Sequence, residues 1–86
     1  MKAERNYMEQ KIIKIKLDTA EKIKRFLQVT RSFLSDIDIM TDRAIVDAKS
    51  VLGIYALNLS DDTYVRIISD NVVECRNFYA AMEEFR

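Results

Sequence analysis

The chain has 86 residues, which is enough for one small domain with a single hydrophobic core. Hydrophobic residues make up 49% of it, charged residues make up 33%, and the formal net charge is zero. No apolar run approaches the ~20 residues that span a bilayer, and the charged start MKAERNYMEQ is unlike a secretory signal peptide. A single cysteine cannot form an internal disulfide, so we expect a cytoplasmic protein that does not enter a membrane.

The absence of histidine argues against several kinds of metal site and catalytic site. With one cysteine and no histidine, the chain offers no plausible zinc cluster and no Ser-His-Asp or Cys-His relay. A single glycine cannot form a Gly-rich phosphate loop. Carboxylates occur in pairs at positions 36 and 38, 61 and 62, and 83 and 84, but none has the apolar flanks that raise a carboxyl pKa for acid catalysis. We therefore predict a non-enzyme without a cofactor or a metal site.

Charge is distributed unevenly along the chain. Residues 1–34 carry nine Lys/Arg against four Asp/Glu, a balance of +5, and residues 35–86 carry five against ten, a balance of −5. A nucleic-acid binder usually has a larger basic excess, with aromatic side chains along a basic stripe. We interpret the basic half as solvated surface and do not expect nucleic-acid binding.

The first half of the chain predicts a strand followed by a helix. Residues 1–10 form a polar lead-in to a domain that we place at 11–86. Apolar and charged residues alternate in KIIKIKL (11–17), which indicates a half-buried strand. Asp18 precedes Glu21 by three residues, a capping-box pattern that starts a helix. The helix should end at Ser35 and Asp36, and its apolar face collects Ile23, Phe26, Leu27, Thr30, Phe33 and Leu34.

The second half predicts three strands and two helices. Residues 37–39 and 44–48 indicate two strands joined by a turn at 41–43. Ser50, a preferred N-cap, should open a short helix that runs to about Leu59. Residues 64–69 form a further strand, and Asp70 and Asn71 cap a last helix. The apolar face of that helix carries Val72, Cys75, Phe78, Tyr79, Met82 and Phe85, where we expect a buried and unreactive cysteine.

The element order is therefore β-α-β-β-α-β-α. It fits an α+β domain with a four-stranded antiparallel sheet and its helices on one face. A ferredoxin-like βαββαβ domain shares the first six elements, and periodicity alone does not separate the two folds. The short second helix favours the four-stranded antiparallel sheet with its helices on one face over the ferredoxin-like domain.

One stretch resembles a known family. DAKSVLGIYAL (47–57) is similar to the N-A-K-S-I-M-G-V-M-S-L segment of HPr, the histidine-containing phosphocarrier of the bacterial sugar phosphotransferase system. The similarity extends without an obvious gap from about Lys11 to Phe85. It implies the HPr fold, an open-faced β-sandwich with a four-stranded antiparallel sheet and three helices on one face.

The chain departs from the other signature of this family, G-x-H-A-R-P at the start of the first helix. Counting back without gaps from Ser50 places Thr19 at the histidine, Glu21 at the arginine and Lys22 at the proline. The resemblance therefore implies a diverged relative that cannot act as a phosphohistidine carrier. Nothing near Thr19 would activate its hydroxyl, so we interpret Thr19 as a helix cap.

The resemblance also implies a regulatory role. In many Gram-positive relatives, an ATP-dependent kinase phosphorylates the serine of K-S-I-M-G, and the product binds a transcriptional repressor of carbon catabolite genes. Here that serine is Ser50. The implied protein partners are an HPr-type serine kinase and a transcriptional regulator or another phosphotransferase-system protein. The family's interaction surface corresponds to Lys49, Val51, Leu52 and Tyr55, whereas Ile54 and Leu57 should face the core.

Several alternatives stay open at the level of sequence. Ser50 can be a helix cap alone, and Val51, Leu52 and Tyr55 can be core residues, although so short and apolar a helix cannot bury every face against one sheet. Lys49 is expected to be a solvated charge that could pair with a phosphate on Ser50. The functional alternatives are an HPr-fold interaction module without phosphorylation and a ferredoxin-like domain that binds a small ligand. The oligomeric state is not determined.

Overall fold

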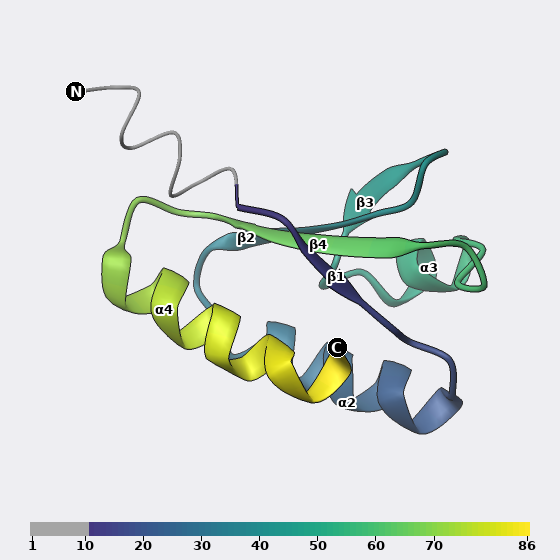
Figure 1. The fold of residues 1–86 in the computed structure, drawn as a ribbon, viewed down its shortest axis with the longest axis horizontal. Coiled ribbons are helices and arrows are strands. Elements are labelled where there is room, and N and C mark those ends of the chain that lie inside the picture. Colours follow the sequence, from purple (N-terminus) through teal and green to yellow (C-terminus); the bar gives the residue numbers. More distant parts are fainter. Residues whose placement is uncertain (1–10) are drawn as a thin grey trace.

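The computed structural model describes residues 11–86, and the predicted polar lead-in at 1–10 lies outside the described residues. The described elements follow the predicted order (Figure 1). They are β1 (Ile13–Ile15), α2 (Ala20–Thr30), β2 (Asp36–Met40), β3 (Ile45–Asp47), α3 (Val51–Tyr55), β4 (Thr63–Ile68), α4 (Val72–Ala81) and the 3₁₀ turn η1 (Met82–Phe85).

The four strands form one antiparallel sheet in the order β1-β4-β2-β3. Val65 at the middle of β4 lies opposite Ile13 of β1 on one side and Ile39 of β2 on the other. Helices α2 and α4 run along one side of this sheet, and α3 lies at its end, next to β3 (Figure 1). The predicted sheet with three helices is confirmed, and α3 is as short as the HPr-like alternative requires.

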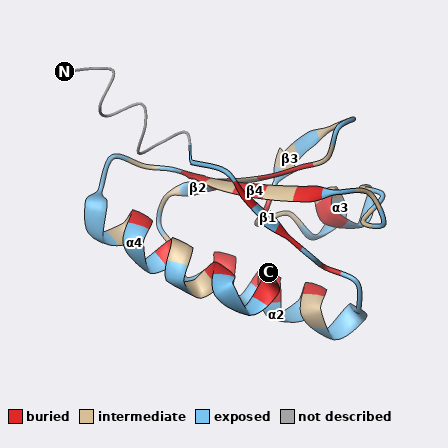
Figure 2. Cartoon of the chain, in the orientation of Figure 1, coloured by how far each residue is buried: buried red, intermediate tan, exposed pale blue. Residues whose placement is uncertain are grey.

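The core lies between the sheet and the helices (Figure 2). Alternate residues of each strand point inward, which is why β2 buries Ile37 and Ile39 while the side chain of Asp38 between them stays about a quarter exposed. Aromatic rings close the helical side, with Phe26 of α2 packed edge-on against Phe85 of η1 at 5.4 Å between centroids. Cys75 is buried in α4, as predicted, and its thiol donates a hydrogen bond to the Ser69 carbonyl.

Two predicted helices are shorter in the structure. Helix α2 ends at Thr30 instead of Ser35, because the chain tightens there into turns in which Phe33 N–H donates to Thr30 O. Leu34 therefore leaves the buried face on which it was predicted and is 95% exposed. Helix α3 ends at Tyr55 instead of Leu59. In the loop that follows, the side-chain oxygen of Asn58 accepts hydrogen bonds from the N–H and the hydroxyl of Ser60, which stabilise the turn.

Candidate functional site

Helix α3 begins at the serine singled out by the sequence. Ser50 has an extended backbone, and its hydroxyl oxygen accepts a hydrogen bond from Gly53 N–H at 3.1 Å. This is the N-cap geometry that was predicted. Ser50 is half-buried, and its hydroxyl holds the first turn of the helix together.

The apolar side chains of α3 divide into an inner and an outer set. Ile54 is fully buried in the core, whereas the outer set, which we call the α3 surface, consists of Val51, Leu52 and Tyr55. These three are 39%, 85% and 59% exposed. The interpretation of all three as core residues is therefore wrong, and an apolar surface lies directly beside Ser50.

Gly53 allows α3 to approach the sheet closely. A Cβ atom at this position would lie 3.3 Å from Ser50 Oγ and 3.4 Å from Val46 Cβ on β3. The absent side chain thus leaves room for the capping hydroxyl and for the neighbouring strand.

Lys49 was predicted to be a solvated charge, but its side chain contacts another segment of the protein. Its ammonium nitrogen donates a hydrogen bond to the carbonyl oxygen of Phe33 at 2.7 Å, and the side chain is half-buried. Its backbone N–H donates to the Asp47 carboxylate at 2.9 Å. Lys49 therefore links the segment before α3 to the segment after α2, and the prediction of a solvated charge is wrong because the Phe33 carbonyl offers the ammonium a partner within the protein.

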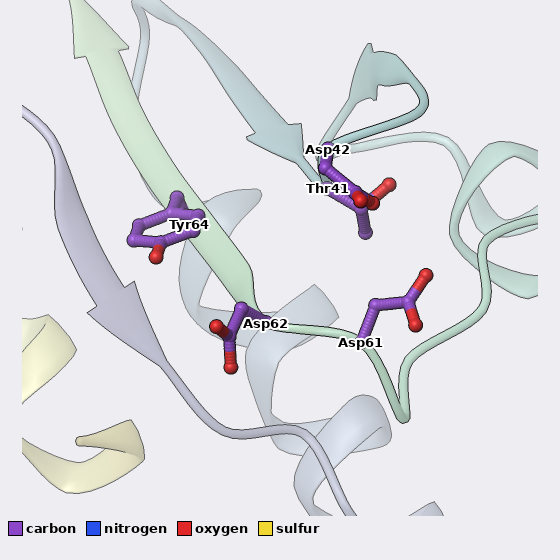
Figure 3. A pocket seen from close by; sticks show the side chains of 5 residues that line it. All are labelled: Thr41, Asp42, Asp61, Asp62 and Tyr64. Atoms are coloured by element: carbon purple, nitrogen blue, oxygen red, sulfur yellow. The ribbon is translucent and has the colours of Figure 1, made fainter.

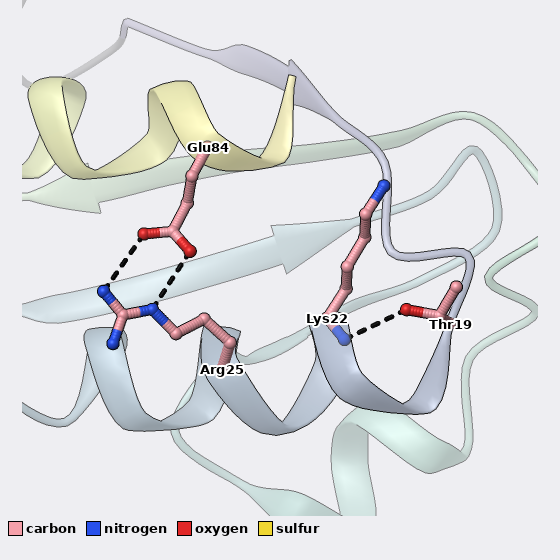
Figure 4. Close-up of polar contacts among 4 residues, drawn as sticks. All are labelled: Thr19, Lys22, Arg25 and Glu84. Carbon is pink, nitrogen blue, oxygen red and sulfur yellow. Dashed lines mark hydrogen bonds and ion pairs between the residues drawn. The ribbon is translucent and has the colours of Figure 1, made fainter.

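The side chain of the N-cap residue satisfies a backbone N–H at the N-terminus of α2. Thr19 is the N-cap, and its hydroxyl oxygen accepts from Lys22 N–H at 3.1 Å (Figure 4). The interpretation of Thr19 as a helix cap is therefore confirmed, whereas the predicted capping box from Asp18 to Glu21 is wrong, because Asp18 is not the N-cap. Asp18 instead pairs with the Lys22 ammonium at 3.0 Å, and this hydrogen bond lowers the pKa of the Asp18 carboxyl.

Several cations near the N-terminal half of α2 form ion pairs with carboxylates. Arg25 of α2 forms a two-bond ion pair with Glu84 of η1, at 3.0 and 3.2 Å (Figure 4). Lys14 of β1 pairs with Asp62 at 3.3 Å. Because a carboxylate already accompanies each of these cations, the region has little net positive charge to attract a phosphate.

Three carboxylates line an open pocket of about 440 Å³ at one end of the sheet. Figure 3 shows Asp42 and Thr41 on one side of it, and Asp61, Asp62 and Tyr64 on the other. Within residues 11–86, no group of His, Cys, Asp or Glu is arranged to hold a metal ion. The pocket brings these carboxylates together with the side chains of Thr41 and Tyr64.

The comparison with protein families decides the identity. The model for the PTS HPr component phosphorylation site matches residues 14–85, which is most of the chain. The chain belongs to the HPr family. Proteins of this family are phosphate carriers rather than enzymes, and they interact with other proteins of the phosphotransferase system.

A solved structure supports the same assignment. This HPr-family chain is similar to the crystal structure of a phosphocarrier protein HPr from Bacillus anthracis strain Ames, with 25% sequence identity and a TM-score of 0.61. The match covers 84% of this chain and 92% of that chain. A comparison with curated protein sequences finds no significant match. Across residues 11–86 no helix is long and apolar enough to cross a membrane.

The sequence missed one cluster in this HPr-family chain. Phe33, Leu34 and Ser35, which connect α2 to β2, are held by Lys49 from one side and by Glu74 of α4 from the other. These contacts join segments far apart in the chain, and no local motif marks them. The only trace in the sequence is an apolar Leu34 next to a polar Ser35, which is also what an ordinary helix end looks like.

Proposed function

We propose that this HPr-family chain is a cytoplasmic regulatory or adaptor protein of the bacterial sugar phosphotransferase and carbon-regulation system. It acts through the α3 surface, it does not carry phosphohistidine, and a serine kinase switches it at Ser50. The observation that carries the proposal is an apolar surface, with Leu52 85% exposed, placed directly beside a serine hydroxyl.

The surroundings of Thr19 support the loss of the carrier role. The chain contains no histidine, so a phosphohistidine cannot form. Thr19 Oγ1 already serves the first turn of α2 as a cap, and a phosphothreonine ester lacks the transfer potential of a phosphohistidine. Asp18 and Glu21 flank the position and would repel a phosphate.

Phosphorylation of Ser50 would change the charge beside the α3 surface. The kinase would transfer the γ-phosphoryl group of ATP to Ser50 Oγ, with release of ADP and the hydroxyl proton. The new group brings ~1.5–2 negative charges and strong hydrogen-bond acceptors. A partner with a basic group next to an apolar pocket would then distinguish the two forms. The proposed partners are an HPr-type serine kinase and a transcriptional regulator or another phosphotransferase-system protein.

The test is intact-mass spectrometry after incubation with a Gram-positive HPr kinase and ATP. We expect one added phosphate on the wild-type protein and on Ser32→Ala, which removes an exposed serine elsewhere, but none on Ser50→Ala. An ordinary HPr in the same reaction shows that the kinase is active. If that protein is modified and this chain is not, the proposed switch is wrong.

A second candidate is an interaction module of the same fold without phosphorylation. It is favoured by the exposure of Leu52, which does not depend on any modification of Ser50. Binding of Ser50→Ala and Ser50→Asp to a purified phosphotransferase-system partner separates the two functions. A switch predicts that the two variants bind the partner with different affinities. Equal affinities for the two variants, together with loss of binding in Leu52→Ala, would identify the module that works without phosphorylation.

A further inference from the structure

One peptide group of the chain is held at both ends by opposite charges. It is the peptide between Phe33 and Leu34, and we call the arrangement the 33–34 clamp. Its carbonyl oxygen accepts from the ammonium of Lys49 at 2.7 Å, and its N–H donates to the carboxylate of Glu74 at 2.9 Å. The hydroxyl of Ser35 donates to the other oxygen of the same carboxylate.

The charges of the clamp are aligned with the peptide dipole. A cation at the carbonyl oxygen and an anion at the N–H each make a charge-assisted hydrogen bond, which is stronger than a bond between neutral groups. The pKa of Glu74 is lowered, first by the bond from Ser35, then by the Leu34 N–H, and to a smaller degree by the charge of Lys49. The clamp therefore fixes the connection between α2 and β2.

The clamp also sets the position of an exposed apolar side chain. Leu34 is 95% exposed, and Val73, near the start of α4, is 59% exposed. Glu74 and Val73 line an open pocket of about 420 Å³ together with Phe33 and neighbouring polar residues. A change at the clamp would alter a surface that is separate from the α3 surface.

Lys49 connects this clamp to the proposed phosphorylation site, because it directly precedes Ser50. On the basis of the proposed phosphorylation of Ser50, we infer that Lys49 transmits the modification to the connection between α2 and β2. A phosphate on Ser50 draws the Lys49 ammonium away from Phe33 O, opens the 33–34 clamp and changes the surface around Leu34.

The direction of the change follows from the two acceptors that compete for Lys49. Phe33 offers a neutral carbonyl, whereas a phosphoserine offers an anion with several oxygens. The flexible stem of lysine lets its ammonium turn toward an adjacent residue. The ring of Phe33 stays packed against Phe78 at 5.7 Å between centroids, so the change is confined to the peptide and to Leu34.

The test is nuclear magnetic resonance on protein with phosphoserine installed at position 50 during synthesis, so that no kinase is needed. The carbonyl ¹³C signal of Phe33 and the exchange rate of the Leu34 amide report on the clamp. We expect phosphorylation to move the Phe33 signal to the position it has in Lys49→Met. We also expect Leu34 exchange to speed by about tenfold, because loss of the Lys49 bond frees the peptide group to move and weakens the remaining bond from Leu34 N–H to Glu74.

Two comparisons make the outcome decisive. In Lys49→Met the phosphate should have no further effect on the Phe33 signal, whereas Lys49→Arg should keep the response because it keeps the charged donor. The Ser60 amide, which donates to Asn58 in another loop, serves as the unaffected reference. Thermal unfolding of each variant confirms that the fold is retained.

An unmoved Phe33 signal in the phosphorylated protein would overturn the inference, as would an equal shift in the Lys49→Met background. Both results are independent of the kinase reaction. If the kinase leaves Ser50 unmodified while the installed phosphate opens the clamp, the proposed function fails and the coupling through Lys49 stands.

Discussion

Truncation of Ile54 tests the division of α3 into a buried and an exposed side. Ile54 is fully buried, and it is the only residue of this five-residue helix in the core, whereas Leu52 is 85% exposed two positions earlier. Ile54→Ala and Leu52→Ala remove similar amounts of aliphatic side chain from one helix. They therefore form a matched pair in which burial is the main difference.

The expected loss of stability is large for one variant and small for the other. Ile54→Ala loses about 2 kcal/mol of transfer free energy at ~0.8 kcal/mol per carbon group, and the cavity left behind raises the total to ~3 kcal/mol. Leu52→Ala should change the free energy of unfolding by less than about 0.5 kcal/mol, as a surface substitution does. A chain of this length has about 4–13 kcal/mol of stability, so Ile54→Ala should still fold.

Urea unfolding followed by far-ultraviolet circular dichroism measures both variants. With a slope of ~1 kcal/mol/M for a small domain, the midpoint of Ile54→Ala should fall by about 3 M, and that of Leu52→Ala by less than about 0.5 M. Equal losses in the two variants would refute the exposure of Leu52. A loss below about 1 kcal/mol in Ile54→Ala would refute its role as the core anchor of α3.

Three further predictions concern polar contacts. Thr19→Ala should destabilise the domain by about 1 kcal/mol through loss of the α2 cap, and Thr19→Ser should restore most of it; equal unfolding midpoints for the two variants would contradict the capping role. Asp38→Ala should cost about 1 kcal/mol in thermal unfolding, because it leaves Arg66 unpaired on the sheet where both side chains are about a quarter exposed; a change within error would show that solvent replaces the pair. The hydrogen bond from Ser35 lowers the pKa of Glu74 from its ordinary value of 4.5, so the contribution of this carboxylate to stability is present above that pH and is lost as the pH falls through the lower folded pKa. Ser35→Ala should raise that pKa in a carboxyl ¹³C titration, and an unchanged titration would remove Ser35 as its main cause.

Much of the fold follows from local patterns. Alternation in β1 and β4, the helical spacing of Phe26 and Leu27, and the preference of Ser50 for an N-cap are properties of neighbouring residues. The resemblance to HPr also predicted that Leu52 lies at the surface, and it is exposed in the structure. The element order and the fold class were therefore predictable.

The boundaries of the helices were less predictable than their existence. The apolar spacing of α2 continues through Leu34, but Thr30 bonds to Ala48 O and the chain turns there. At the start of α2 the sequence offered both Asp18 and Thr19 as capping residues, since both types can cap a helix, and Thr19 is the one that caps it in the structure.

The amino-acid sequence was enough to predict which elements form and which of their faces are apolar, and it shows that histidine is missing, because these features depend on side-chain type and on spacing along the chain. The pairing of the polar groups, in contrast, is set by the packed fold. Lys49 finds the carbonyl of Phe33, Glu74 finds the N–H of Leu34, and Arg25 finds Glu84 across long stretches of sequence. Such contacts depend on which segments the packed sheet and helices bring together, and no local pattern records that proximity.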